Sequence, residues 1–200
     1  MRLQILEQGH RPLQKLILSL IRVTSEGQVP GPILVLSYRR ELFGKYLAAC
    51  FQEGMRAARE WSVGEVELFA AFVSKLNACQ YCLGDHTAVA VLRMGDDKLV
   101  AAVLENWRTA PVNEKVRSML GFLEKLTLAP ADVGTADVEP LRAVGLSDRA
   151  IEEAIYICFL FSVMDRLADA FDFTLPSATG VQRNGRMLYR LGYRAASIPG

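Results

Sequence analysis

The stretch that decides the fold and the chemistry of this chain is Asn77-Ala78-Cys79-Gln80-Tyr81-Cys82-Leu83-Gly84-Asp85-His86. It holds two of the four cysteines and one of the two histidines within eight residues. In a helix, Cys79, Cys82 and His86 would occupy positions i, i+3 and i+7 and would share one face. A helical face of this composition indicates either thiol redox chemistry or a metal site.

A metal site is the less favoured of these two interpretations. The face offers three ligands, whereas zinc sites usually have a fourth protein ligand or an open water position. No second pair of ligands is near in sequence, because Cys50 and Cys158 are isolated and His10 is distant. These two cysteines are most simply core residues. A thioredoxin-like motif would follow a strand, and covalent haem attachment needs a histidine where the chain has Leu83.

Thiol redox chemistry agrees better with the surroundings of the motif. The cysteines are expected near the start of a helix, where free backbone N–H groups and the positive end of the helix dipole favour thiolate over thiol. His86 lies one turn from Cys82 and can serve as its base. If the chain reverses near residues 77–78, an antiparallel hairpin brings Glu67 opposite His86 to orient the imidazole. The simpler alternatives to these catalytic roles are that Glu67 faces solvent and that the two cysteines are small hydrophobic residues of the core.

Neighbouring side chains are expected to have simpler roles. Tyr81 is expected to pack or to line a pocket, and Phe69 and Met164 are further candidates for the pocket wall. Asp85 points to another side of the helix than His86 and is expected to be exposed.

Helical periodicity extends along most of the chain, and no region shows the sustained alternation of a strand. Ser62 and Glu65 form a capping box that starts the helix before the motif. Gly95 is expected to end the motif helix. We therefore predict an all-α fold of about eight helices, with the C-x-x-C motif at the start of a central helix.

The chain is predicted to be a single domain over residues 1–200. Residues 1–29 form an N-terminal arm or helix, residues 30–176 the core, and residues 177–200 a basic C-terminal segment. The arginines of that segment are Arg183, Arg186, Arg190 and Arg194. They are expected to form a solvated helical face or a contact between subunits.

Composition narrows the class of protein. Hydrophobic residues make up 51% of the 200 residues and charged residues 22%, which is typical of a globular protein with a sizeable core. A net charge of +1 gives no electrostatic case for nucleic-acid binding. Neither a signal peptide nor a membrane span is recognisable, so a cytoplasmic protein is expected. In that compartment a close cysteine pair is more often catalytic or metal-binding than structural.

The pattern E-x11-C-x-x-C-x-x-x-H begins at Glu67 and ends at His86, after a capped helix. Over residues 62–90 it resembles the alkylhydroperoxidase D-like (AhpD-like) group of the carboxymuconolactone decarboxylase superfamily. Weaker similarity extends over about residues 30–171. Phrases that resemble the peroxidase-related branch are Glu124-Lys125-Leu126-Thr127, Leu141-Arg142-Ala143-Val144-Gly145-Leu146-Ser147 and Asp165-Arg166-Leu167-Ala168-Asp169.

The resemblance implies an all-helical fold, a homo-oligomer (often a trimer or hexamer) and thiol peroxidase chemistry. It implies that Cys82 is the peroxidatic thiol, that Cys79 resolves it to a disulfide, and that His86 and Glu67 form the proton relay. Tyr81 stands where the best-studied members have a histidine. The reductant would be an external dithiol or a lipoyl protein, and no bound cofactor or metal is expected.

The leading hypothesis is therefore a cysteine-based hydroperoxide reductase that cycles through a Cys79–Cys82 disulfide. A non-catalytic redox sensor or a disulfide oxidoreductase on the same scaffold stays open as an alternative. A decarboxylase or lactone-type enzyme is a further alternative, although the decarboxylase branch lacks the cysteine pair.

Overall fold

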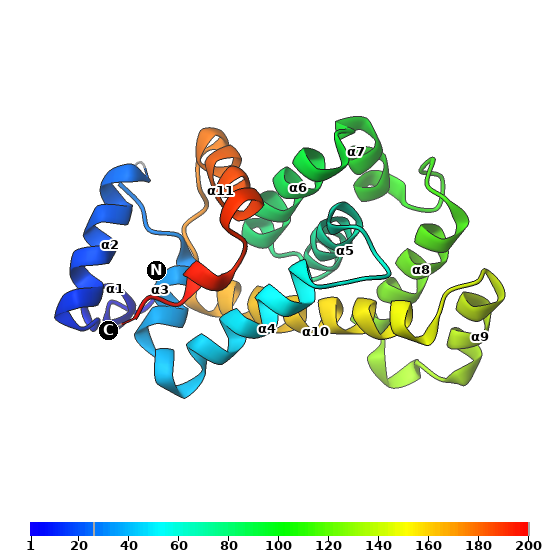
Figure 1. Ribbon diagram of the computed structural model, residues 1–200, viewed down its shortest axis with the longest axis horizontal. Helices are drawn as coiled ribbons and strands as arrows, with labels where there is room; N and C mark the ends of the chain where they lie inside the picture. Colours follow the sequence, from blue (N-terminus) through cyan, green and yellow to red (C-terminus); the bar gives the residue numbers. More distant parts are fainter. Residues whose placement is uncertain (26, 200) are drawn as a thin grey trace.

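The computed structural model describes residues 1–25 and 27–199, and every regular element in these ranges is helical (Figure 1). The all-α prediction is confirmed, with eleven α-helices in the described residues rather than about eight. The difference comes from elements of one to three turns, which are too short to show a clear period in the sequence. The helices are α1 (Ile5–Gln8), α2 (Pro12–Thr24), α3 (Gly31–Tyr38), α4 (Lys45–Arg56), α5 (Val63–Leu76), α6 (Gln80–Met94), α7 (Asp97–Asn106), α8 (Glu114–Leu128), α9 (Thr135–Ala143), α10 (Asp148–Phe171) and α11 (Ala178–Leu191).

Two residues of the predicted single domain, Glu26 and Gly200, lie outside the described residues, and the single-domain organisation stays a prediction. None of the helices in the described part of the chain is long and apolar enough to span a bilayer.

Helix α5 is the centre of the fold. Ten of its 14 residues are buried, and a helix that is apolar on all sides belongs in a core. It packs against α4, α6, α7, α8 and α10, which surround it in Figure 1. Its start is the predicted capping box: the Glu65 amide donates to the Ser62 hydroxyl, and the Ser62 amide donates to the Glu65 carboxylate.

A tight turn joins α5 to α6 and reverses the chain where the sequence predicts. Ala78 has φ +59°, a left-handed conformation that is uncommon for alanine and ends α5 abruptly. Cys79 is then extended and is the N-cap of α6, so Cys82 lies in its first turn. At the other end Gly95, with φ +68°, stops α6 as expected.

Helix α11 and the residues after it cover the start of α6. Gly185 allows this close packing, because a Cβ at that position would lie 2.9 Å from the Cβ of Ala88. The chain then crosses back over α4, in red in Figure 1. Three of the predicted basic residues, Arg186, Arg190 and Arg194, are exposed. The opposite face of this segment is part of the site described next.

Candidate active site

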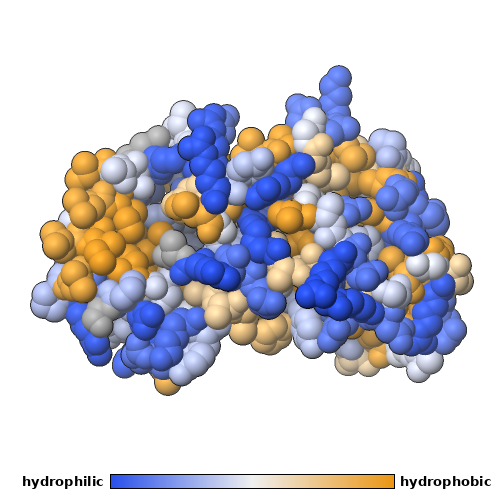
Figure 2. All heavy atoms as spheres, in the orientation of Figure 1, coloured by the Kyte–Doolittle hydropathy of each residue, from blue (hydrophilic) through white to orange (hydrophobic). Residues whose placement is uncertain are grey.

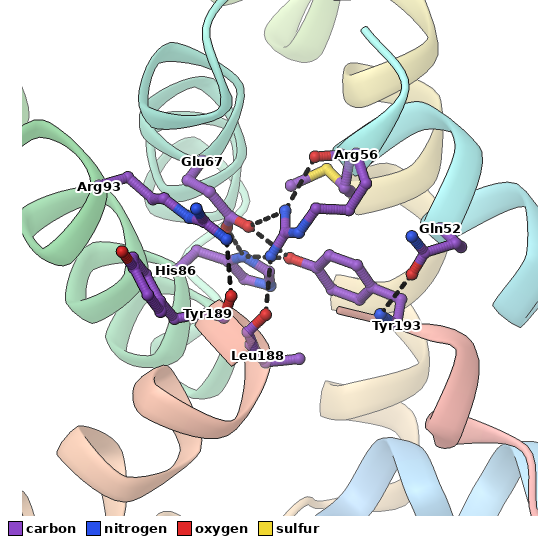
Figure 3. Close-up of polar contacts among 9 residues, drawn as sticks. Gln52, Arg56, Glu67, His86, Arg93, Leu188, Tyr189 and Tyr193 are labelled. Atoms are coloured by element: carbon purple, nitrogen blue, oxygen red, sulfur yellow. Dashed lines mark hydrogen bonds and ion pairs between the residues drawn. The ribbon is translucent and has the colours of Figure 1, made fainter. Parts of the chain in front are cut away.

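The α5–α6 hairpin places Glu67 and His86 in direct contact. Glu67 is completely buried, and its Oε2 lies 2.7 Å from Nδ1 of His86 (Figure 3). Since Nδ1 is used in this way, Nε2 is the ring nitrogen left for other partners. The imidazole is fixed by the edge-on ring of Phe161, 4.4 Å away between centroids, and by stacking on Tyr193.

Arg56 and Tyr193 complete this cluster and were not identified from the sequence. The Arg56 guanidinium donates to Oε1 of Glu67 at 2.6 Å, and the Tyr193 hydroxyl donates to the same oxygen at 2.8 Å. Arg56 also donates to the backbone carbonyls of Met55 and Leu188. Figure 3 shows these groups converging from α4, α5, α6 and the C-terminal segment. Residues 178–191 are amphipathic, which is typical of a helix that packs on another element, but this pattern identifies neither Arg56 nor Tyr193.

The charge on Glu67 follows from these partners. Burial raises the pKa of a carboxyl, but the hydrogen bond and charge of His86 and the charge of Arg56 outweigh it and lower the pKa of Glu67. Glu67 is therefore an ionised carboxylate that holds the Nδ1 side of the imidazole.

The two cysteines of the motif lie together with an acidic residue from α10. The sulfurs of Cys79 and Cys82 and a carboxylate oxygen of Asp165 all lie within 4.8 Å of one another, and both cysteines are free thiols. Ser74 donates to Oδ1 of Asp165 at 3.0 Å, and Asn77 donates to Oδ2 at 2.8 Å. The spacing of the three donor atoms alone would admit a metal ion. Both carboxylate oxygens already accept hydrogen bonds, however, and His86 is not part of the group.

The position of Cys82 at the start of α6 does not make it acidic. The hydrogen bond to Cys79, burial, and the carboxylate of Asp165 raise the pKa of Cys82 well above its usual value. The expected lowering by the helix dipole is therefore wrong, because these three effects outweigh it. Cys82 rests as a thiol and needs a base when it reacts.

A narrow cavity of about 90 Å³ reaches Cys82. Its wall is mostly apolar, and Cys82 and His86 both line it. Tyr81 and Met164 contribute to the wall as predicted. Phe69 does not, because it points into the core and packs on Trp61 with 4.9 Å between ring centroids.

Asp85 is a correction to the sequence analysis. It was expected to be exposed, but it is 6% exposed and lines the cavity. The side chain of Asn184 donates to its carboxylate at 3.2 and 3.4 Å. Burial raises the pKa of Asp85 to about 6. α11 covers the face of α6 that was expected to meet solvent.

Cys50 is a second correction. It is exposed rather than part of the core, whereas Cys158 is buried as expected. A π-helical turn at Arg40–Gly44 precedes α4. Such a turn shifts the register of the following helix, so that Phe51 faces inward in α4 and Cys50 faces outward.

Comparison with known proteins gives no match to a family model or to a curated protein, but several solved structures match. An uncharacterized peroxidase-related protein from Silicibacter sp. TM1040 is 29% identical, with a TM-score of 0.72 over 86% of this chain and 88% of that chain. An uncharacterized peroxidase-related protein from Ralstonia eutropha JMP134, described as an alkylhydroperoxidase AhpD core, is 23% identical, with a TM-score of 0.73 over 90% and 92%.

The debrominase Bmp8 is 20% identical, with a TM-score of 0.69 over 87% of this chain and 92% of that chain. All three alignments cover most of both chains, and the resemblance found in the sequence is therefore supported by the arrangement of the helices. The chain has the AhpD-like fold of the peroxidase-related proteins, with a Cys79–Cys82 pair at the start of α6.

Proposed function

We propose that this protein is a cysteine-based hydroperoxide reductase in which Cys82 attacks the peroxide and Cys79 resolves the product to a disulfide. One observation carries the proposal: of the two neighbouring cysteines, Cys82 lines the cavity, whereas Cys79 is completely buried and does not line it. A substrate that enters the cavity meets Cys82 first. The apolar wall favours an organic hydroperoxide over a charged substrate.

The first step needs the Cys82 thiol to lose its proton. His86 lines the same cavity and contacts Glu67 through Nδ1, so Nε2 is the atom that takes this proton, directly or through one water. Glu67 fixes the tautomer that leaves Nε2 as the acceptor and stabilises the imidazolium. The thiolate then attacks one peroxide oxygen, the O–O bond breaks, and the alcohol leaves with the proton from His86. Cys82 becomes a sulfenic acid.

In the second step Cys79 displaces the hydroxyl group from the Cys82 sulfur, which gives the disulfide and water. An external dithiol returns the pair to two thiols by exchange. Cys82 is only 2% exposed, and a slender dithiol such as a lipoyl arm reaches it more easily than a cysteine on a folded surface.

A homo-oligomer, with a trimer or hexamer implied by the resemblance, is part of the same proposal. Helix α2 carries an exposed apolar stripe, and Figure 2 shows apolar side chains gathered over this end of the molecule. The stripe consists of Leu13, Leu16, Leu20 and Val23. Burial of this stripe between copies would remove it from water.

The test is turnover of cumene hydroperoxide with dihydrolipoamide as the reductant. Cys82→Ser is expected to abolish turnover, whereas Cys50→Ser, the matched change at an exposed cysteine, is expected to leave it intact. Full activity of Cys82→Ser would refute the proposal, and it would point to cysteine-independent lactone or decarboxylase chemistry. A disulfide that forms without turnover would instead identify a redox sensor.

A further inference from the structure

A second group of polar side chains lies beside the cysteine pair and, unlike Cys82, does not line the cavity. Asp165 is 1% exposed and, together with Ser74 and Asn77, belongs to a buried hydrogen-bonded cluster. Among the described residues that line the cavity, Asp165 and Cys79 are absent. This carboxylate therefore cannot meet a substrate in the cavity, but it lies within 4.8 Å of both sulfurs.

The two sides of Cys82 correspond to the two partners of its sulfur. A peroxide, and later the hydroxyl group of the sulfenic acid, occupy the cavity side. Cys79 is completely buried and does not line the cavity, and its sulfur lies within 4.8 Å of that of Cys82. Displacement at sulfur proceeds with the attacking and leaving groups on opposite sides of the sulfur atom, which suits an attacking thiol that does not share the cavity with the leaving group. The attack needs Cys79 as a thiolate, and His86 lines the cavity that Cys79 does not line.

We propose that Asp165 is the proton acceptor for Cys79 when the disulfide closes and the proton donor to Cys79 when the disulfide is reduced. The inference rests on the proposed disulfide cycle. It assigns to α10 a catalytic side chain that is separate from the Glu67–His86 relay.

The steps balance. On closure the Cys79 proton passes to Asp165, the Cys79–Cys82 bond forms, and the bond between the Cys82 sulfur and its hydroxyl oxygen breaks. The hydroxide leaves into the cavity and becomes water with a proton from solvent, while Asp165 keeps the Cys79 proton. On reduction a thiolate of an external dithiol attacks Cys82, and Cys79 leaves and recovers its proton from Asp165. The second thiol of the reductant then releases Cys82.

The surroundings of Asp165 suit a group that gains and loses a proton. Burial raises the pKa of Asp165, and the hydrogen bonds from Asn77, the Cys82 thiol and Ser74 only partly oppose this effect. The Cys82 thiol is this partner only in the reduced protein, since the sulfur of the sulfenic acid carries no proton to donate. The positive charge of His86, when this residue is protonated, opposes the rise as well. A neutral acid next to a neutral disulfide avoids the cost of an unpaired buried charge.

The test measures closure of the disulfide without a peroxide. In a Cys50→Ser background, methyl methanethiosulfonate places a methylthio group on Cys82, and Cys79 then displaces methanethiol. Mass spectrometry of quenched samples gives the rate of closure. Asp165→Asn is compared with Asp169→Asn, which changes an exposed carboxylate one turn further along α10.

We expect Asp165→Asn to slow closure about 100-fold at pH 7, the usual contribution of a positioned base, and Asp169→Asn to change nothing. Without the base, closure should accelerate about tenfold per pH unit as hydroxide takes over. A merely misplaced Cys79 would slow closure equally at every pH. Wild-type closure rates in Asp165→Asn would overturn the inference.

Ser74→Ala is a second variant, milder in its effect on folding. Loss of one hydrogen bond to Oδ1 makes Asp165 more basic, so the inflection of the closure rate with pH should move to higher pH. An unmoved inflection would contradict the role of Asp165. A protein that closes its disulfide normally but does not reduce hydroperoxides would refute the proposed function and leave this inference standing.

Discussion

Replacement of Glu67 by glutamine removes one charge from the centre of the site and nothing from its volume. In the wild type the carboxylate accepts from Nδ1 of His86, so the free lone pair of the neutral ring is on Nε2. The glutamine amide can instead donate to Nδ1, which moves the ring proton to Nε2. The imidazole then cannot take a proton from Cys82.

The expected loss of rate follows from the same change. An amide in place of the carboxylate that orients a catalytic histidine costs up to ~10⁴-fold, and loss of general-base catalysis costs about 10²- to 10⁴-fold. We expect sulfenic acid formation in Glu67→Gln to fall by at least about 100-fold. The fold should survive. Loss of one partner from a buried ion pair costs about 3–5 kcal/mol, and the lower end applies because Arg56 keeps the carbonyls of Met55 and Leu188.

The assay is stopped-flow reaction with cumene hydroperoxide in a Cys79→Ser background, with the sulfenic acid of Cys82 trapped by dimedone. Glu65→Gln is the matched control, since it lies two residues earlier in α5 and belongs to the exposed capping box. It should cost about 1 kcal/mol of stability at most and leave the rate unchanged. A Glu67→Gln rate within threefold of the wild type would refute the relay.

Two further predictions concern the side chains around the relay. Asp85→Asn removes a carboxyl whose pKa rises to about 6 in the fold. Because this pKa is raised, the wild type loses stability as the pH rises from about 4 to 6. The variant should therefore gain stability over the wild type across this window, by up to roughly 3 kcal/mol above pH 6 as measured by urea unfolding. An advantage that is the same at pH 4 and pH 7 would contradict this. Tyr193→Phe keeps the ring stacked on His86 but removes the hydroxyl that donates to Glu67. The substitution should lower the free energy of unfolding by about 1.5 kcal/mol and reduce the rate of sulfenic acid formation far less than Glu67→Gln does. An equal loss of rate would mean that the hydroxyl itself transfers protons.

Local signals in the sequence were sufficient for the hairpin. The capping box at Ser62, the stop at Gly95 and the reversal near Ala78 all depend on residues within a few positions of one another, and all were predicted. Because two antiparallel helices joined by a short turn have few possible registers, the pairing of Glu67 with His86 could also be anticipated.

Contacts between distant parts of the chain could not be anticipated in this way. Tyr193 meets Glu67 across 126 positions, and Asp165 meets Ser74 across 91. Periodicity shows which face of a helix is apolar, but it does not show which later helix covers a polar face. Asp85 was therefore expected in solvent although Asn184 of α11 covers it. Asp165 comes from the distant α10 as well, and it adds to the hydrogen bond of Cys79 and to burial in raising the pKa of Cys82.

Of the three buried carboxylates at the site, Glu67 and Asp165 have surroundings that favour opposite protonation behaviour, and this contrast argues for two roles. Glu67 has Arg56 and His86 against it, its pKa is lowered, and it stays ionised while it orients a base. Asp165 has neutral hydrogen-bond donors, its pKa is raised, and it can take up and release a proton. Titratable groups with diverging environments are a common way to divide acid and base work within one site. Disulfide formation takes one proton from each thiol, from Cys82 when it meets the peroxide and from Cys79 on closure. A relay on the cavity side alone serves one of them, and Asp165 is the described carboxylate in position to serve the other.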